Sequence, residues 1–379
     1  MNREMHQQCE ARSRQRVALL ALLALMVLFA SGIEAAPDLS LERVPDHGIQ
    51  PRLFTDNMGL MHLVYFKPVD SSGRGPALGN LYYRYRGSRG KWSEPEVVSD
   101  IFRHGDAVRK ASVAAGDAGS IHVVWLKSDE APEYYYSRRI GNRFETPRSV
   151  VKNSLSGVET EASIAALGNE VSIVWHAGSM LRESSRQVFR VLSVDNGVTF
   201  GNEIAISDQR LGACACCGLA SSLRNDGFLV AYRSAVNDSG RHMQLLKSND
   251  GWRTQTVSEW SLTTCPVSSN SLTGDWLVFE TRGALFKFDV RKDFPLIQVA
   301  PKEDAERQKH PSIAIGDHGE QLITWGEGPG YFDGGILNFQ LQSGDGTLLP
   351  TPDTSGMEIP KYSVAAAGYT PESGFVVLY

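Results

Sequence analysis

The chain has 379 residues, with 38 Lys and Arg against 43 Asp and Glu, and a formal net charge of −5. Its basic residues are scattered, whereas a nucleic-acid-binding surface needs them clustered, so we expect no nucleic-acid partner. The length suits two ordinary domains or one large repeat fold.

The first 35 residues are predicted to be a secretory signal peptide. Four arginines between positions 3 and 16 precede an unbroken apolar run over 17–30, and Ile33 and Ala35 take the −3 and −1 positions of a cleavage site. This run is shorter than the about 20 residues that a membrane span needs. We therefore expect a periplasmic or secreted protein with no membrane span after cleavage, and an uncleaved anchor is the alternative.

One hairpin pattern recurs along the rest of the chain. Its clearest copy, residues 111–125, has a short apolar strand, a Gly/Asp turn and a second apolar strand that ends in an aromatic residue. Further strand-like runs follow each copy. The copies end at Tyr65, Trp125, Trp175, Tyr232, Phe279 and Trp325, so successive copies end 46 to 60 residues apart. Periods of this length with several short strands are typical of β-propeller blades.

The end of the chain indicates how the ring closes. Residues 363–379 repeat the hairpin a seventh time and stop at Tyr379, and the run 39–44 is a candidate for the missing outer strand of that blade. Joining both termini in one blade would protect the sheet edges. We predict an all-β fold, a single β-propeller over 36–379 closed by N- and C-terminal strands. Seven blades are favoured, and six with an accessory hairpin is the alternative.

The segment from Ser193 to Phe200 resembles the Asp box of sialidase-like (BNR-repeat) propellers. The matching positions are Ser193, Asp195, Gly197, Thr199 and Phe200. In that family the box lies in the turn between the third and fourth strands of a blade. The resemblance implies a structural role, in which the carboxylate caps backbone N–H groups and the glycine takes a positive φ.

Sialidase chemistry itself is not expected. The enzymes of the family bind the substrate carboxylate with three arginines, the first of them in an Arg-Ile-Pro-type motif, and use a Tyr–Glu nucleophile pair and an Asp acid/base. The nearest text here, Gln50-Pro-Arg52, lacks that order. The sequence assigns no catalytic residue, so whether the protein is an enzyme stays open, leaning towards no.

Four cysteines follow the predicted signal peptide and form two groups. Cys214-Ala-Cys216-Cys217 precedes one hairpin, and Thr264-Cys265-Pro266 precedes the next. This pairing resembles uncharacterised exported sialidase-like proteins that carry a CxCC segment followed, one blade later, by Gly-Cys-Pro. Thr264 replaces that glycine. The resemblance indicates a site and implies no particular activity.

Counting back from the aromatic that ends each hairpin places these cysteines on the repeat. Cys217 and Cys265 fall where other blades have Gln50, Lys110, Thr160 or Glu161, and His310. All these positions precede the innermost strand, and innermost strands line the channel of a propeller. We therefore expect a ring at one channel mouth, where Cys214, Cys216 and Cys217 face Cys265 from the next blade and His310 lies nearby.

Three interpretations of the cysteines stay open. The first is two disulfides, for instance one joining the CxCC segment to Cys265 and one within the segment, which fits an oxidising compartment. The second is a thiolate site for a soft ion, with Cys214, Cys216, Cys217, Cys265 and His310 as candidate ligands. Copper is favoured over zinc, because mononuclear zinc prefers two to four residues between ligands. A redox-active thiol pair ranks third, because the CxCC segment is not interpreted as a C-x-x-C motif.

We accordingly predict an exported propeller whose Cys-rich channel mouth binds a soft metal ion or a small ligand. The first alternative is a glycan-processing hydrolase that uses carboxylates on the same face. The second is a non-catalytic scaffold that binds a protein partner on a propeller face and keeps its cysteines as structural disulfides.

Overall fold

The computed structural model describes residues 37–70, 77–87, 90–104, 110–127, 132–249, 251–293, 295–300, 307–330, 333–353 and 355–379. The chain divides into two compact units, Met1–Pro37 and Asp38–Tyr379. The predicted signal peptide lies outside the described residues and stays a prediction. Within the described part, no helix is long and apolar enough to cross a membrane.

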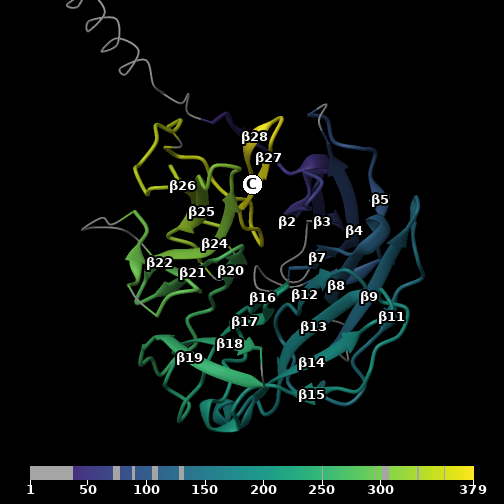
Figure 1. Ribbon diagram of the computed structural model, residues 1–379, viewed down its shortest axis with the longest axis vertical. Coiled ribbons are helices and arrows are strands. Elements are labelled where there is room, and N and C mark those ends of the chain that lie inside the picture. The colour runs from purple at the N-terminus through teal and green to yellow at the C-terminus, as the bar shows by residue number, and fades with distance from the viewer. Residues whose placement is uncertain are drawn as a thin grey trace, which may run out of the picture. The chain divides into compact units, whose positions relative to one another are not determined.

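The second unit is a β-propeller. Its described residues form seven small sheets arranged around a central axis (Figure 1). The predicted all-β fold with seven blades is confirmed. The only helical elements among the described residues are four single 3-10 turns: η1 (Pro45–His47), η2 (Asp117–Gly119), η3 (Glu183–Ser185) and η4 (Gln209–Leu211).

The first four blades follow the chain from the innermost strand outwards. Blade 1 contains β2 (Ile49–Thr55), β3 (Met61–Asp70), β4 (Ala77–Arg86), β5 (Glu96–Val97) and β6 (Phe102–His104). Blade 2 contains β7 (Ser112–Ala115), β8 (Ile121–Lys127), β9 (Glu133–Ile140), β10 (Arg143–Phe144) and β11 (Arg148–Ser149). Blade 3 contains β12 (Ser163–Leu167), β13 (Glu170–Ala177), β14 (Gln187–Ser193) and β15 (Ile204–Ala205). Blade 4 contains β16 (Ala220–Arg224), β17 (Gly227–Arg233), β18 (Met243–Ser248) and β19 (Trp252–Ser258).

The last three blades complete the ring. Blade 5 contains β20 (Asn270–Thr273), β21 (Trp276–Thr281), β22 (Ala284–Asp289) and β23 (Ile297–Gln298). Blade 6 contains β24 (Gln308–Ile315), β25 (Gln321–Glu327) and β26 (Ile336–Gln342). Blade 7 contains β27 (Ala366–Thr370), β28 (Gly374–Leu378) and β1 (Leu39–Glu42), and β1 pairs with β28 in parallel. Strands from both ends of the described chain thus share one sheet.

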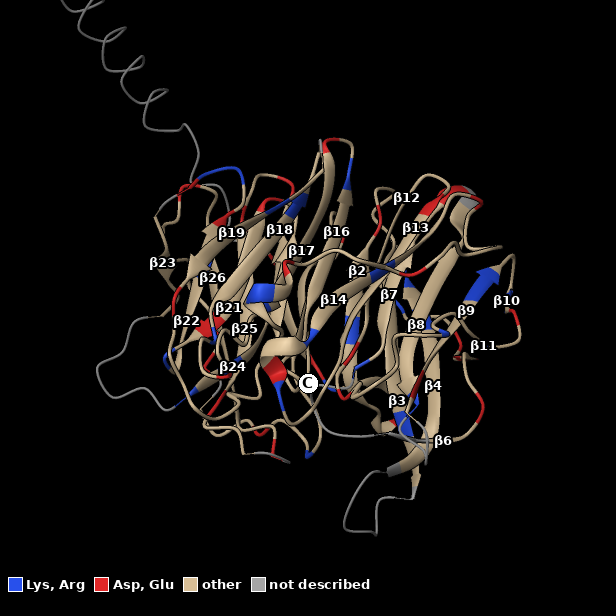
Figure 2. Cartoon of the chain, turned by 90° about the horizontal axis from the view of Figure 1, so that it is seen from below, with Lys and Arg blue, Asp and Glu red and all other residues tan. Residues whose placement is uncertain are grey.

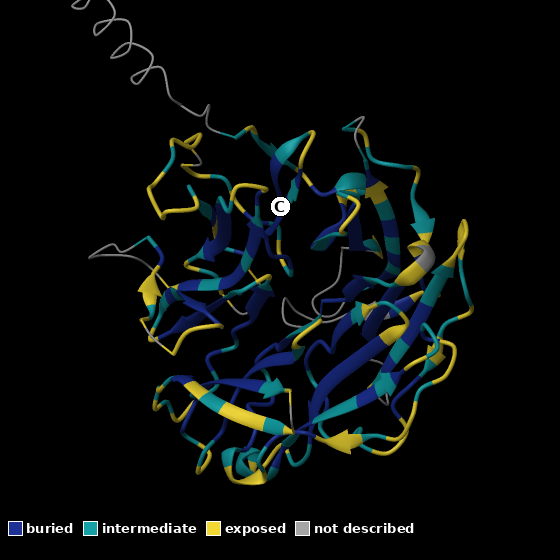
Figure 3. Ribbon diagram, in the orientation of Figure 1, coloured by how far each residue is buried: buried dark blue, intermediate teal, exposed yellow. Residues whose placement is uncertain are grey.

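The core lies between neighbouring blades. Trp125 of blade 2 packs in one cluster with Val64 and Phe66 of blade 1, and Trp175 of blade 3 packs with Tyr134 of blade 2. The inner and middle strands are mostly buried, whereas the outer strand β19 is largely exposed (Figure 3). Acidic and basic residues are interspersed over the outer loops and strands (Figure 2). The recurring aromatic residue thus packs against the preceding blade, as Trp125 does against blade 1 and Trp175 against blade 2.

Serine hydroxyls join the innermost strands around the channel. The Oγ atoms of Ser112 and Ser163 accept hydrogen bonds from the backbone N–H of Ile164 and Ser221, each in the following blade. Ser271 and Ser312 do the same for Ile313 and Ala367. An innermost strand has an unpaired edge towards the channel, so these hydroxyls satisfy backbone donors that would otherwise lack a partner.

The segment that resembles an Asp box closes the turn between β14 and β15, the third and fourth strands of blade 3. Asp195 accepts from the backbone N–H of Thr199 at 2.9 Å and from its hydroxyl at 2.6 Å, and Ser193 Oγ accepts from the N–H of Gly197 at 2.8 Å. These hydrogen bonds lower the pKa of Asp195. Phe200 packs edge-on against Tyr136 with ring centroids 5.0 Å apart, which fastens the turn to blade 2.

Gly197→Ala is expected to destabilise the propeller more than Gly141→Ala does. Both glycines have positive φ, +76° and +62°, so both changes carry the same backbone strain of about 1 kcal/mol. A Cβ at Gly197 would lie 1.9 Å from the Tyr136 hydroxyl, whereas one at Gly141 meets nothing within 4 Å. We expect the clash to cost roughly 1–3 kcal/mol more. Equal unfolding midpoints of the two variants in urea would contradict this packing.

Beside this turn, His122 is expected to make stability depend on pH. Its ring contacts the Tyr136 hydroxyl at 2.7 Å and Asn196 Oδ1 at 3.1 Å, and burial lowers its pKa from 6.5 to about 4. As the pH falls, His122 is therefore protonated in the unfolded chain before it is protonated in the folded protein. The contribution of neutral His122 to the free energy of unfolding is fully present above pH 6.5. It falls as the pH drops towards 4, by about 1.4 kcal/mol per pH unit. The free energy of unfolding, measured by urea titration of wild type and His122→Gln at several pH values in this range, should change less with pH in the variant.

Candidate functional site

The cysteine segment lies where blades 3, 4 and 5 meet. Residues 214–217 follow η4 and lead into β16, and Cys265 lies in the connection from β19 to β20. The backbone N–H of Cys214 donates to the Arg233 carbonyl at 2.9 Å, and that of Gly218 donates to the Ser268 carbonyl at 2.9 Å. These bonds to β17 and to the blade-5 connection bring the two cysteine groups of the sequence together.

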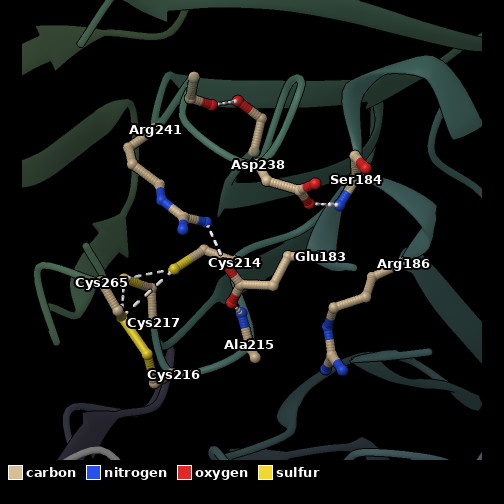
Figure 4. Close-up of polar contacts among 12 residues, drawn as sticks. Glu183, Ser184, Arg186, Cys214, Ala215, Cys216, Cys217, Asp238, Arg241 and Cys265 are labelled. Carbon is tan, nitrogen blue, oxygen red and sulfur yellow. Dashed lines mark hydrogen bonds and ion pairs between the residues drawn. A yellow bond between two sulfur atoms is a disulfide. The ribbon is translucent and has the colours of Figure 1, made fainter. Parts of the chain in front are cut away.

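The four sulfur atoms form one cluster (Figure 4). Cys216 and Cys265 form a disulfide across a separation of 49 residues, and Cys214 and Cys217 are free thiols, both buried. The Sγ–Sγ distances are 3.3 Å from Cys214 to Cys217, 3.4 Å from Cys214 to Cys265 and 3.9 Å from Cys217 to Cys265. Cys214 and Cys217 lie deepest, and Cys216 and Cys265 are half-buried at the outer side of the cluster.

The two thiols differ in acidity. Burial opposes ionisation of Cys217, but the hydrogen bond that Cys214 donates to it and the nearby charge of Arg233 outweigh burial and lower its pKa. That same hydrogen bond, together with burial, raises the pKa of Cys214 well above its ordinary value. Cys217 is therefore the first thiolate of the cluster, and Cys214 is the proton donor that stabilises it.

Glu183 and Arg241 hold the segment from the side of blades 3 and 4. Glu183 Oε1 accepts from the Ala215 N–H at 2.7 Å, and its Oε2 lies 2.5 Å from Arg241 Nη1 (Figure 4). Arg241 is almost fully buried, and the thiols and Glu183 raise its pKa. A buried guanidinium next to sulfur favours thiolate over thiol. Neither residue was predicted from the sequence, because Glu183 lies in the connection from β13 to β14 and Arg241 in that from β17 to β18, both far from the cysteines along the chain.

His176 fixes the backbone of the segment. Its Nε2 donates to the Cys217 carbonyl at 2.9 Å, and its Nδ1 accepts from Arg186 at 3.0 Å. Burial, with the charge of Arg186, lowers its pKa to about 3. His176 is thus neutral, with its imidazole engaged on both sides, and acts as a positioning residue for Cys217.

The ring at the start of the innermost strands has a different composition from the one expected. Lys110, Glu161 and His310 take the expected positions, but in blades 4 and 5 the ring residues are Gly218 and Ser269. The count-back from Phe279 overshoots by four residues, because Ser271 pairs with Val278 across a tight hairpin while Ser312 pairs with Thr324 across a longer one. Cys217 precedes the ring by one residue and Cys265 by four, so the cysteine cluster lies beside the ring.

His310 belongs to this ring. Its Nδ1 contacts Ser269 Oγ at 3.2 Å, and burial followed by the charge of Lys110 lowers its pKa well below the ordinary value. Among the described residues, the groups of Cys, His, Asp and Glu within ligand distance of one another are Cys214 with Cys217 and Cys265, and Glu183 with Cys214 and Cys216. His310 is in neither group, so the structure brings the four cysteines together without it.

The low rank of a redox-active thiol pair rested on the absence of C-x-x-C spacing, and on this point the prediction is wrong. Cys214 and Cys217 have two residues between them, and their sulfur atoms are in contact. This is the C-x-x-C spacing that metal and thiol–disulfide sites share. A buried thiol pair next to a half-buried disulfide can ligate a soft ion or exchange with the disulfide. The structure has one disulfide and two free thiols, whereas the two-disulfide interpretation expects a second bond.

Comparison with known proteins places the fold. No family model and no curated protein matches the chain. Among solved structures, a Hadza microbial sialidase shares 12% identity at a TM-score of 0.50, over 78% of this chain and 66% of that one. A Dyadobacter fermentans protein of unknown function shares 12% at 0.52, over 82% and 95% of the two chains. An Aleuria aurantia lectin in complex with Fucα1-6GlcNAc shares 11% at 0.51, over 81% and 97%.

These identities are too low to transfer an activity, and this chain spans under two thirds of the sialidase's length. A fold also hosts many functions. The likeness shows that the chain has a sialidase-like β-propeller fold.

Proposed function

We propose that the protein binds a soft metal ion, Cu(I) in preference to Zn(II), through the sulfur atoms of Cys214, Cys217 and Cys265. The observation that carries the proposal is the triangle of these three atoms, with edges of 3.3, 3.4 and 3.9 Å. Three thiolates around one ion with metal–sulfur bonds near 2.3 Å lie about 3.8–4.0 Å apart. The sulfur atoms need to separate by about 0.7 Å or less to hold an ion.

The disulfide controls how much of this ligand set is free. Cys265 is bonded to Cys216, so the complete set forms after a thiol reductant delivers two electrons and two protons to the Cys216–Cys265 bond. The ion then displaces protons from the thiols, because the thiolate is the ligand. Arg241 and Arg233, which lie beside the thiols, offset the negative charge that the thiolates bring into the buried site.

Sulfur-only ligation favours copper. Thiolates select Cu(I) and zinc over harder ions, and the described residues that meet at the triangle offer no imidazole. Zn(II) is the second candidate, since Cys214 and Cys217 have a separation that zinc sites use. The protein is further proposed to be exported, which the presence of a disulfide supports.

The experiment is an anaerobic titration of the fully reduced protein with Cu(I) in competition with a colorimetric Cu(I) chelator, and a parallel titration with Zn(II). The expected result is one Cu(I) per chain, held more tightly than Zn(II). Failure of the reduced protein to withdraw Cu(I) from a weak chelator would refute the proposal, and a clear preference for Zn(II) would correct the ion.

A further inference from the structure

We propose that the central channel contains a second site, which binds a small organic anion through Arg52. This inference uses none of the four cysteines. A cavity of about 500 Å³ runs along the innermost strands of all seven blades, from Arg52 past Thr55 to the hairpin turns at Asn57 and Gly274. Asn57 is exposed, so the cavity communicates with solvent at that end.

Arg52 interrupts a layer of small residues. In each blade one residue of the innermost strand pairs with the residue before the recurring aromatic, and Arg52 pairs with Val64 in this way. The matching residues of the other six blades are Ser112, Ser163, Ala220, Ser271, Ser312 and Ala366. Arg52 is therefore the one long cationic side chain among these seven matching residues, and the other six are serine or alanine.

The charge of Arg52 is not balanced by a carboxylate of its own. The nearby acid is Glu161, but its Oε1 forms an ion pair with Lys110 at 3.5 Å. Lys110 also reaches across the ring to Ser269 Oγ at 3.3 Å. Among the described residues, no group hydrogen-bonds to the Arg52 guanidinium, and burial lowers its pKa. In the part of the chain that the structure describes, two cations facing one carboxylate leave an excess positive charge at the Arg52 end of the cavity, which an anion would neutralise.

Further donors lie at the same end. Ser271 and Ser312 line the cavity, and each accepts a backbone N–H from the next blade. In the described part of the chain neither hydroxyl proton has an acceptor, so both can donate to a ligand. Arginine with hydroxyl donors is a suitable set for a carboxylate or phosphate group.

The rest of the lining defines the body of the ligand. Val113, Ile164, Leu272 and Ile313 contribute apolar surface next to the Arg52 level, and Ser221 and Ser222 add hydroxyl groups there, while Asp56 and Asp317 lie towards the outer end of the cavity. These two acids disfavour a second negative charge there. The volume falls in the range of small-molecule sites. The ligand class that fits is a compact molecule with one anionic head and an uncharged body.

The test uses butyrate as the carboxylate probe, butanol as its uncharged counterpart and inorganic phosphate as the phosphate probe. Isothermal titration of the full-length secreted chain should show saturable binding of butyrate, little of butanol, and weaker binding at high salt. Tighter binding of phosphate than of butyrate would assign the head group as phosphate. Arg52→Gln should weaken binding of the preferred anion at least tenfold, and Arg52→Lys should give an intermediate affinity.

The matched control is Arg253→Gln, which removes an exposed arginine from the outer strand β19 and should bind as wild type does. Thermal unfolding gives a second measurement that requires no detectable heat. The anion should raise the midpoint of wild type but not that of Arg52→Gln. Without ligand, the midpoint of Arg52→Gln should equal or exceed that of wild type, because a half-buried charge is gone. Wild type without saturable binding of either anion, or Arg52→Gln binding as wild type does, would overturn the proposal.

Discussion

Cys216→Ser is expected to take up Cu(I) without a reductant, whereas wild type requires reduction first. The substitution removes the partner of Cys265 and leaves Cys214, Cys217 and Cys265 as thiols, with their sulfur atoms 3.3–3.9 Å apart. Cys265→Ser also removes the disulfide, but it deletes one of the three ligands. We expect it to bind Cu(I) more than about 100-fold more weakly than Cys216→Ser, since even an outer-shell partner of a metal site is worth 10–100-fold.

The pair is matched because both variants lose the same bond and gain one serine at a half-buried position. Competition with a Cu(I) chelator under argon, with and without prior reduction, measures both affinities. Equal affinities of Cys216→Ser and Cys265→Ser would contradict the assignment of Cys265 as a ligand. Tighter binding by Cys265→Ser would assign Cys216 in its place, consistent with the second group of Cys214, Cys216 and Glu183.

Reduction of the disulfide is expected to lower the stability of the metal-free propeller by about 4 kcal/mol. The Cys216–Cys265 bond closes a loop with a sequence separation of 49 residues. Loss of the bond restores the conformational entropy of that loop to the unfolded chain, and the chain-entropy estimate for a loop of this length is about 4 kcal/mol. Urea unfolding with a metal chelator present, with and without a thiol reductant, measures the difference.

Two variants make this measurement specific. Cys216→Ser has no disulfide to lose, so reductant should leave its midpoint unchanged. Cys214→Ala keeps the disulfide and should be as sensitive to reductant as wild type is. A wild-type midpoint that does not respond to complete reduction would contradict the chain-entropy account, and would indicate that the reduced unfolded chain retains structure around this loop.

The fold was predictable because the blades repeat. An aromatic residue ends each second strand and packs against the preceding blade, as Trp125 and Trp175 do, so a recurring structural requirement left a recurring signal. The positions of individual residues were less predictable. Counting along the sequence assumes hairpins of equal length, but the hairpin at Gly274 is shorter than the others. The residue at the ring position of blade 5 is therefore Ser269 and not Cys265.

The site was predictable in part for a similar reason. The proximity of Cys265 to the CxCC segment follows from neighbouring blades, but which of Cys214, Cys216 and Cys217 bonds to Cys265 depends on side-chain directions that sequence spacing does not encode. The contributions of Glu183 and Arg241 depend on loops of two blades meeting in space. Arg52 is conspicuous only after strand pairing aligns it with serines and alanines.

The most direct test of the account is the intact mass of the purified protein, measured native and denatured after reduction and exposure to one equivalent of Cu(I). We predict a native mass increased by one copper and a denatured mass in which Cys214, Cys216, Cys217 and Cys265 are all thiols. Before reduction, the denatured mass should lie two hydrogen masses lower, for the one disulfide. A reduced protein that carries no copper, or a denatured mass four hydrogen masses below the all-thiol value that resists reduction, would instead identify the cysteines as structural and contradict a metal site.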